Sequence, residues 1–113
     1  MARPVALDPA EVEAAIAAPD GPAWELLGGK LVTTVDCGSF PAALEFVAAV
    51  GGLAEEADHH PDIDIRYRRV TLALVTHDVG GITVLDLELA RAIDALVDRS
   101  PDPGTGPSGG PAQ

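Results

Sequence analysis

The sequence predicts an α+β domain in which a four-stranded antiparallel sheet carries three helices packed on one face. Apolar residues recur at helical spacing in three segments and at alternating spacing in four shorter ones. The segments follow one another in the order α-β-β-α-β-β-α, and consecutive strands have short connections, which is typical of antiparallel hairpins. With 113 residues and 47% hydrophobic content, the chain is long enough for one core. We therefore expect residues 1–99 to form a single domain.

The first helix is expected to run from Pro9 to about Ala18. Asp8 stands at the capping position, Pro9 suits the first turn, and Glu11 completes a capping-box pattern. Residues 19–22, with the sequence PDGP, end the helix because proline and glycine disfavour its continuation.

The segment 24–35 (WELLGGKLVTTV) predicts the first pair of strands. Gly28 and Gly29 are expected to form its turn, because glycine tolerates the backbone conformations of a two-residue hairpin loop. Such a turn pairs Leu26 with Leu31 and places both side chains on one face of the sheet.

The second helix is expected to begin at a Ser39 cap and to end near Asp58, since Pro61 disfavours helical geometry in the residue before it. Gly51 and Gly52 interrupt its apolar pattern, and each costs about 1 kcal/mol relative to alanine. We therefore expect another backbone to pack closely against this glycine pair, or the pair to be a weak point of the helix.

The second pair of strands is expected over residues 63–67 and 70–77, because apolar and polar residues alternate in both segments. The two strands are joined at Arg68 and Arg69. His77 should therefore end the fourth strand, on the face opposite its leucines.

The third helix is expected to begin at a Thr83 cap, after Gly80 and Gly81 break the chain, and to run to about Asp98. Residues 100–113 are rich in proline and glycine and contain no large apolar side chain. We expect this segment to be a disordered tail.

The charge and composition argue against several classes of function. Seven Lys and Arg against eighteen Asp and Glu give a formal net charge of −11, so too few basic residues are available to bind nucleic acid or an anionic membrane surface. The single Cys37 permits no internal disulfide, which fits a reducing compartment. No apolar run is long enough to span a bilayer and no targeting signal is visible. We expect a soluble, cytoplasmic protein.

The three histidines, His59, His60 and His77, all fall between Glu55 and Asp86. Imidazole gains and loses protons near neutral pH, so adjacent histidines among acidic residues suit general acid–base chemistry. Asp86 shares a helical stripe with apolar residues that should be buried, and a buried carboxylate needs a partner. A histidine is a natural partner, because the carboxylate fixes the tautomer of the imidazole and stabilises its cation.

Structural interpretations stay open for each of these residues. His59 and His60 could cap the C-terminus of the second helix, and His77 could be a surface residue at a strand end. Asp86 stands three residues after Thr83 and could bind the free amides of the first helical turn. A zinc site is disfavoured, because adjacent histidines on extended backbone point to opposite sides and the usual zinc spacings are absent. The patterns of a serine or cysteine nucleophile and of a phosphate-binding glycine loop are absent as well.

A longer pattern joins these residues. Glu55 is followed after three residues by His59-His60-Pro61, after five more by Tyr67, after nine more by His77 and after eight more by Asp86. This spacing resembles the signature of the pterin-4a-carbinolamine dehydratase family. The flanking segments THDVGGIT and DLELARAID are similar to that family too.

The likeness covers roughly residues 23–97 and is strong from Glu55 onward. It is weaker in the second strand. Thr33 and Val35 stand there where family members commonly carry a basic residue and aromatic residues.

The resemblance implies an enzyme that dehydrates 4a-hydroxytetrahydrobiopterin to quinonoid dihydropterin in tetrahydrobiopterin recycling. In such a reaction one imidazole protonates the leaving 4a-hydroxyl while another takes a proton from a ring nitrogen, and neither a metal nor an organic cofactor is needed. The resemblance also implies a homodimer or homotetramer. Some relatives serve instead as dimerisation cofactors or assembly proteins, and a non-catalytic binding role is the alternative function.

The resemblance assigns roles to nine residues in this chain. The implied catalytic residues are His59, His60, His77 and Asp86, and the implied substrate-binding residues are Glu55, Asp58, Pro61, Thr76 and Asp78.

Overall fold

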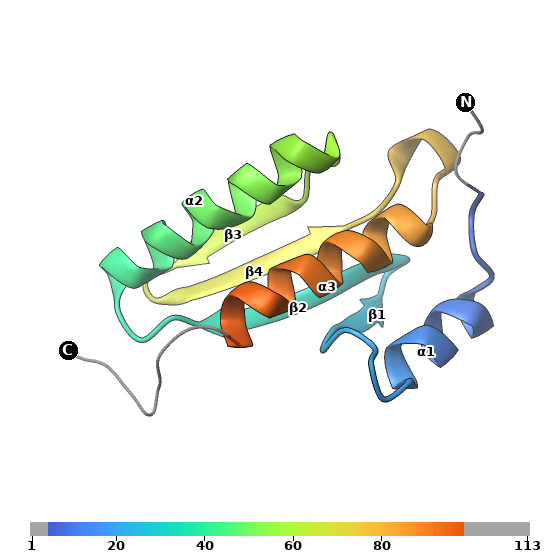
Figure 1. Cartoon of the computed structure of the whole chain (residues 1–113), viewed down its shortest axis with the longest axis horizontal. Coiled ribbons are helices and arrows are strands. Elements are labelled where there is room, and N and C mark those ends of the chain that lie inside the picture. The colour runs from blue at the N-terminus through green and yellow to red at the C-terminus, as the bar shows by residue number, and fades with distance from the viewer. Residues whose placement is uncertain (1–4, 99–113) are drawn as a thin grey trace.

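The computed structural model of the chain describes residues 5–98 and has the predicted order of three helices and four strands over that range (Figure 1). The α+β class is thereby confirmed. A short 3₁₀-helix, η1, is the one element without a counterpart in the expected order. The tail expected at residues 100–113 lies outside the described residues. The elements are α1 (Pro9–Ala17), β1 (Glu25–Leu27), β2 (Lys30–Asp36), α2 (Phe40–Ala57), β3 (Asp62–Arg66), β4 (Arg69–Leu74), η1 (His77–Val79) and α3 (Val84–Asp98).

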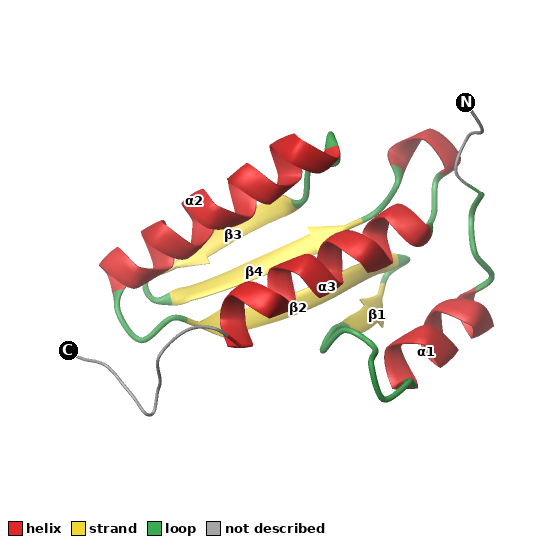
Figure 2. Ribbon diagram, in the orientation of Figure 1, coloured by secondary structure: helices red, strands yellow, loops and turns green. Residues whose placement is uncertain are grey.

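The four strands form one antiparallel sheet in the order β1-β2-β4-β3. Leu26 faces Leu31 across the first hairpin, as the two-residue glycine turn predicted. In the central ladder Leu31 pairs with Leu74, which continues the apolar face of the sheet. Figure 2 shows α2 and α3 lying along one face of the sheet, with α1 beside β1. The sheet therefore has one covered face and two strand edges, β1 and β3.

The core lies between the sheet and the helices and is almost entirely aliphatic. Val12 brings α1 into the same cluster, although α1 lies at the edge of the sheet. Each fully buried aliphatic side chain contributes about 1.5–3 kcal/mol relative to an exposed one. The fully buried residues of the cluster include Leu31, Leu72 and Leu74 from the sheet, Val50 from α2, and Ala90 and Ile93 from α3.

The connections on either side of β4 differ from the expected ones. The hairpin between β3 and β4 turns at Tyr67, which has a left-handed φ of 56°, and Arg69 already belongs to β4. The prediction of a junction at Arg68 and Arg69 was therefore displaced by one residue. The turn is set by the pairing of Arg66 with Arg69, which leaves two residues between them.

The prediction that His77 ends the fourth strand was wrong. β4 ends at Leu74, and Thr76 makes only an isolated bridge to Gly81. The reason is the tight turn between them, in which Gly80 takes a left-handed φ of 67° and its N–H donates to the carbonyl of Thr76 at 3.0 Å. His77 consequently begins η1, on a loop beyond the strand.

No other backbone within residues 5–98 packs closely against the glycine pair of α2, so that expectation was wrong, and the alternative of a weak point in the helix stays a prediction. A Cβ atom added to Gly51 or Gly52 would meet no atom within 4 Å among the described residues. Gly21 is the opposite case, because a Cβ there would lie 2.2 Å from the carbonyl oxygen of Ala15. The turn after α1 therefore requires glycine, whereas the middle of α2 does not.

Replacing the exposed glycine of α2 should stabilise the protein. Gly52→Ala should raise the free energy of unfolding by about 1 kcal/mol, because alanine restricts the unfolded chain and favours the helix. For a domain of this size the melting temperature should rise by about 4–8 °C. Circular dichroism melting curves measure the change, and Gly21→Ala is the matched control, which should lower the melting temperature. A melting temperature of Gly52→Ala at or below that of the unchanged chain would contradict this account of the helix.

Candidate active site

The C-terminal end of α2 positions His59. Asp58 ends the helix in the left-handed conformation, with φ 51°. The N–H of His59 then donates to the carbonyl of Ala54 at 3.0 Å, an arrangement typical of helix C-caps. The side chain of His59 is 10% exposed, and its Nε2 lies 2.5 Å from Oδ1 of Asp86. The chain reversal after α2 thus turns this imidazole towards the start of α3.

Asp86 is fully buried in the first turn of α3 and binds groups from three parts of the chain. One oxygen, Oδ1, faces His59, while Oδ2 accepts from the hydroxyl of Thr76 at 2.7 Å and from the N–H of Thr83 at 2.9 Å. The sequence left two interpretations open for Asp86, as a first-turn acceptor and as the partner of a histidine. One carboxylate does both here, because each of its oxygens faces a different partner.

Thr83 belongs to this cluster although the sequence indicated only a helix cap. Its hydroxyl accepts from the N–H of Leu85 at 3.2 Å, which confirms the cap. The same hydroxyl lies 2.8 Å from that of Thr76. Both threonines are buried. The T-x-x-D spacing was the available signal, since it places an N-cap threonine beside the acid three residues later.

His60 points away from this cluster and pairs with Glu55. Its Nε2 lies 2.5 Å from Oε2 of Glu55, and the two side chains are 57% and 78% exposed. Water screens an ion pair at such a surface, so the pair contributes little to stability. Both groups are accessible to a ligand.

His77 and Asp78 are exposed on η1. Their side chains make no hydrogen bond or ion pair within residues 5–98, and the same holds for the side chain of Asp58. Pro61 is half-buried. The structure thus joins His59, Thr76 and Asp86 through hydrogen bonds, and it pairs His60 with Glu55 separately.

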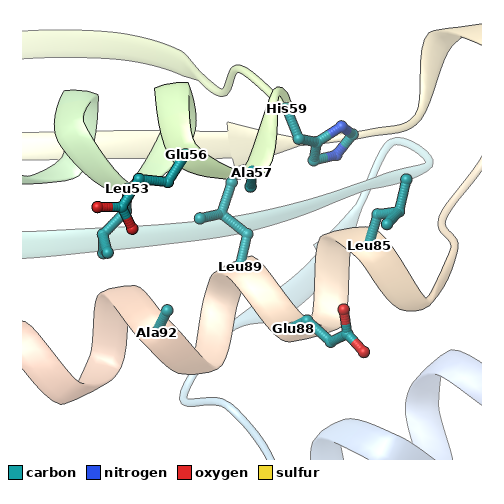
Figure 3. A pocket seen from close by; sticks show the side chains of 8 residues that line it. All are labelled: Leu53, Glu56, Ala57, His59, Leu85, Glu88, Leu89 and Ala92. Atoms are coloured by element: carbon teal, nitrogen blue, oxygen red, sulfur yellow. The ribbon is translucent and has the colours of Figure 1, made fainter.

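A cavity of about 280 Å³ lies between α2 and α3 beside this cluster (Figure 3). Ligand pockets commonly measure about 300–1,000 Å³, so this cavity is small. His59 is the one residue of the nine expected in the site that lines it. The lining residues are Leu53, Glu56, Ala57, His59, Leu85, Glu88, Leu89 and Ala92.

Cys37 does not have the properties of a nucleophile. Its partial burial, and secondly the negative charge of Asp36, raise the pKa of the Cys37 thiol above its ordinary value. The thiol therefore stays protonated at neutral pH. Among residues 5–98, no three side chains of His, Cys, Asp and Glu are grouped so that they could hold a metal ion. None of the helices in this part of the chain is both long enough and apolar enough to cross a membrane.

Comparison with known proteins identifies the family. Residues 5–96 match the family model described as pterin 4 alpha carbinolamine dehydratase, and the chain belongs to this family. A protein of Chloroflexus aurantiacus (strain J-10-fl), provisionally named pterin-4-alpha-carbinolamine dehydratase, is 55% identical over 76 residues, which cover 67% of this chain and 82% of the relative. A protein of Roseiflexus sp. (strain RS-1) with the same provisional name is 47% identical over 91 residues, which cover 80% of this chain and 96% of the relative.

Two solved structures are similar to this fold. The transcriptional coactivator/pterin dehydratase from Brucella melitensis has a TM-score of 0.74 and 32% identity, over 81% of this chain and 98% of that one. A pterin dehydratase-like protein, identified as a RuBisCO assembly factor in the alpha-carboxysome, has a TM-score of 0.59 and 25% identity, over 68% of this chain and 92% of that one.

The two histidine–carboxylate pairs should differ sharply in their effect on stability. Asp86→Ala leaves three buried or nearly buried donors without an acceptor, and each such group costs about 1–3 kcal/mol. Glu55→Ala removes the carboxylate of an exposed pair, which should cost at most about 1 kcal/mol. Urea denaturation followed by circular dichroism measures both changes. Equal losses in the two variants would show that Asp86 is not the buried acceptor described here.

Proposed function

We propose that the chain catalyses the dehydration of 4a-hydroxytetrahydrobiopterin to quinonoid dihydropterin, within tetrahydrobiopterin recycling. The reaction removes the 4a-hydroxyl as water, so this group must gain a proton while a ring nitrogen of the pterin loses one. Side chains that exchange protons near neutral pH supply both steps, and no metal or organic cofactor is required. Membership of the dehydratase family supports this reaction class.

The pairing of His59 with fully buried Asp86 is the observation that carries the proposal. A desolvated carboxylate must be hydrogen-bonded, and His59 is the partner of Oδ1. A histidine that only capped a helix would need no such partner. A carboxylate held against one ring nitrogen orients the imidazole and supports its cation, which is the arrangement of a histidine that transfers protons.

His60 and His77 complete the proposed proton-transfer set. Both are exposed. His60 directly follows His59 and His77 directly follows Thr76, and the side chains of His59 and Thr76 bind the same carboxylate, that of Asp86. Two imidazoles on opposite sides of a flat heterocycle can protonate the hydroxyl and accept the ring proton.

The remaining assignments follow from accessibility. Asp86 is buried and acts through His59, so we assign it a positioning role rather than contact with the pterin. The hydroxyl of Thr76 is likewise occupied by Asp86. We propose that the pterin contacts the accessible residues of the set, which are Glu55, Asp58, Pro61 and Asp78.

A non-catalytic binding role is the second candidate function. It is favoured by the similarity to a protein identified as a RuBisCO assembly factor and to one described as a transcriptional coactivator. Turnover by the unchanged chain separates the two functions. A protein that only binds partners would fold and associate but leave the carbinolamine to dehydrate at its spontaneous rate.

Each histidine of the set should be needed for turnover. His59→Ala, His60→Ala and His77→Ala should each lower the rate by about 10²- to 10⁴-fold, the usual contribution of a general acid or base. The measurement follows chemically generated 4a-carbinolamine by ultraviolet absorbance, with a thermal melt on the same samples. Folded protein with unchanged turnover in two or more of the variants would rule out the catalytic function.

We also propose that the chain forms a homodimer or homotetramer. Four large apolar side chains on α2 and the edge strand β3 are 36–46% exposed. Covering them would remove apolar surface from water, and a second chain could pair with the open edge of β3. The four residues are Phe40, Leu44, Ile63 and Ile65.

Light scattering should therefore give two or four times the monomer mass of 11.6 kDa at micromolar concentration. Leu44→Glu should reduce this mass, because a charge on the exposed apolar face opposes association. Leu27→Glu is the control: Leu27 is also exposed but lies on β1, at the other edge of the sheet. A monomeric mass for the unchanged chain would contradict the proposal.

A further inference from the structure

The hydrogen bonds around Asp86 have a fixed direction. At one end the N–H of Leu85 can only donate, and at the other a carboxylate can only accept. Two hydroxyls lie between them, each with a single hydrogen. Thr76 gives its hydrogen to Oδ2 of Asp86. In the 2.8 Å contact between the two threonines, Thr83 must therefore be the donor, while its oxygen accepts from Leu85.

The direction of these hydrogen bonds determines which groups donate to the carboxylate of Asp86. Oδ2 receives two hydrogens, from the hydroxyl of Thr76 and from the N–H of Thr83. Oδ1 faces Nε2 of His59 and has no other partner within the described residues. A carboxylate in this arrangement accepts at both oxygens, so Nε2 of His59 must carry a hydrogen. Nδ1 is then the nitrogen of this ring that is left to gain and lose a proton.

We propose that Thr83 is a positioning residue of the active site. It holds Asp86 directly through its N–H and indirectly through its hydroxyl, which donates to Thr76, so that His59 exchanges protons with the substrate through Nδ1. Thr83 is fully buried and makes no hydrogen bond to His59, so its effect passes through Asp86 and Thr76. The part that concerns turnover rests on the proposed dehydratase function. The tautomer of His59 does not depend on that function.

The first experiment measures the tautomer directly. Nitrogen-15 NMR of the full chain labelled in histidine distinguishes a ring nitrogen that carries hydrogen from one that does not. We expect neutral His59 to carry its hydrogen on Nε2, and Asp86→Asn to remove this preference. His59 with its hydrogen on Nδ1 would overturn the proposal, whatever the activity of the protein.

The second experiment separates positioning from simple helix capping. Thr83→Val removes the hydroxyl and keeps the shape of the side chain. It should lower kcat roughly tenfold, which is the smaller end of the effect seen at metal sites when a residue that orients a metal-binding histidine is replaced. KM should not change, because Thr83 does not touch the substrate, and Thr83→Ser should restore kcat. Ser39→Ala is the matched control, since Ser39 caps α2 in the same way but has no bond to Asp86.

The outcomes are distinct. Loss of kcat in Thr83→Val, with rescue by serine and no loss in Ser39→Ala, supports the proposal. Unchanged kcat in folded Thr83→Val, or an equal loss in Ser39→Ala, overturns it. If Thr83→Val does not fold, the activity of Thr83→Ser and the tautomer of His59 decide instead. A hydrogen on Nε2 of His59, together with full activity of the serine variant, supports the proposal. If the unchanged chain has no turnover, the dehydratase function fails, and the tautomer alone decides the positioning role.

Discussion

The structure around the candidate site depends on one buried carboxylate. Asp86 is fully enclosed, and a charge in such a place is tolerated only when its hydrogen-bonding capacity is met. Its partners are the end of α2, the residue before η1 and the start of α3. His59 lies 27 residues before Asp86 and Thr76 lies 10 residues before it, so this one carboxylate bonds the end of α2 and the segment before η1 to the start of α3.

The sheet supplies the rigidity that this arrangement needs. β4 is an inner strand, paired with β2 on one side and with β3 on the other. Thr76 follows two residues after it and is fixed by its bridge to Gly81. Beyond that bridge the chain is exposed, and His77 lies there. Loops that extend from a rigid element commonly carry function, because the element sets their position while their side chains remain accessible.

Much of this arrangement follows from local sequence patterns. Its helical spacing with apolar residues such as Leu89 and Ile93 predicted that Asp86 would be buried, and Pro61 predicted the end of α2. The T-x-x-D spacing could have placed Thr83 beside Asp86, but its contact with the hydroxyl of Thr76 could not be predicted, because that contact joins residues seven apart through a turn. The prediction for His77 was wrong, since alternation alone does not distinguish a strand from an isolated bridge. The end of β4 and the contact between the two threonines depend on residues that meet only in the folded protein, and sequence periodicity does not predict such contacts.

Asp86 binds both a histidine and groups near the start of α3, and this affects how activity is inferred from related sequences. Its Oδ2 satisfies the first turn of α3 and the hydroxyl of Thr76, and these bonds would retain their value in a protein with no histidine nearby. An aspartate at this position is therefore expected with or without the histidine, so its presence alone does not indicate chemistry, whereas its pairing with His59 does. His59 is different, because within residues 5–98 its side chain has no hydrogen bond other than the one to Oδ1. Under the proposed function, the residue aligned with His59 is therefore more informative than the aspartate about whether a homologue is an enzyme.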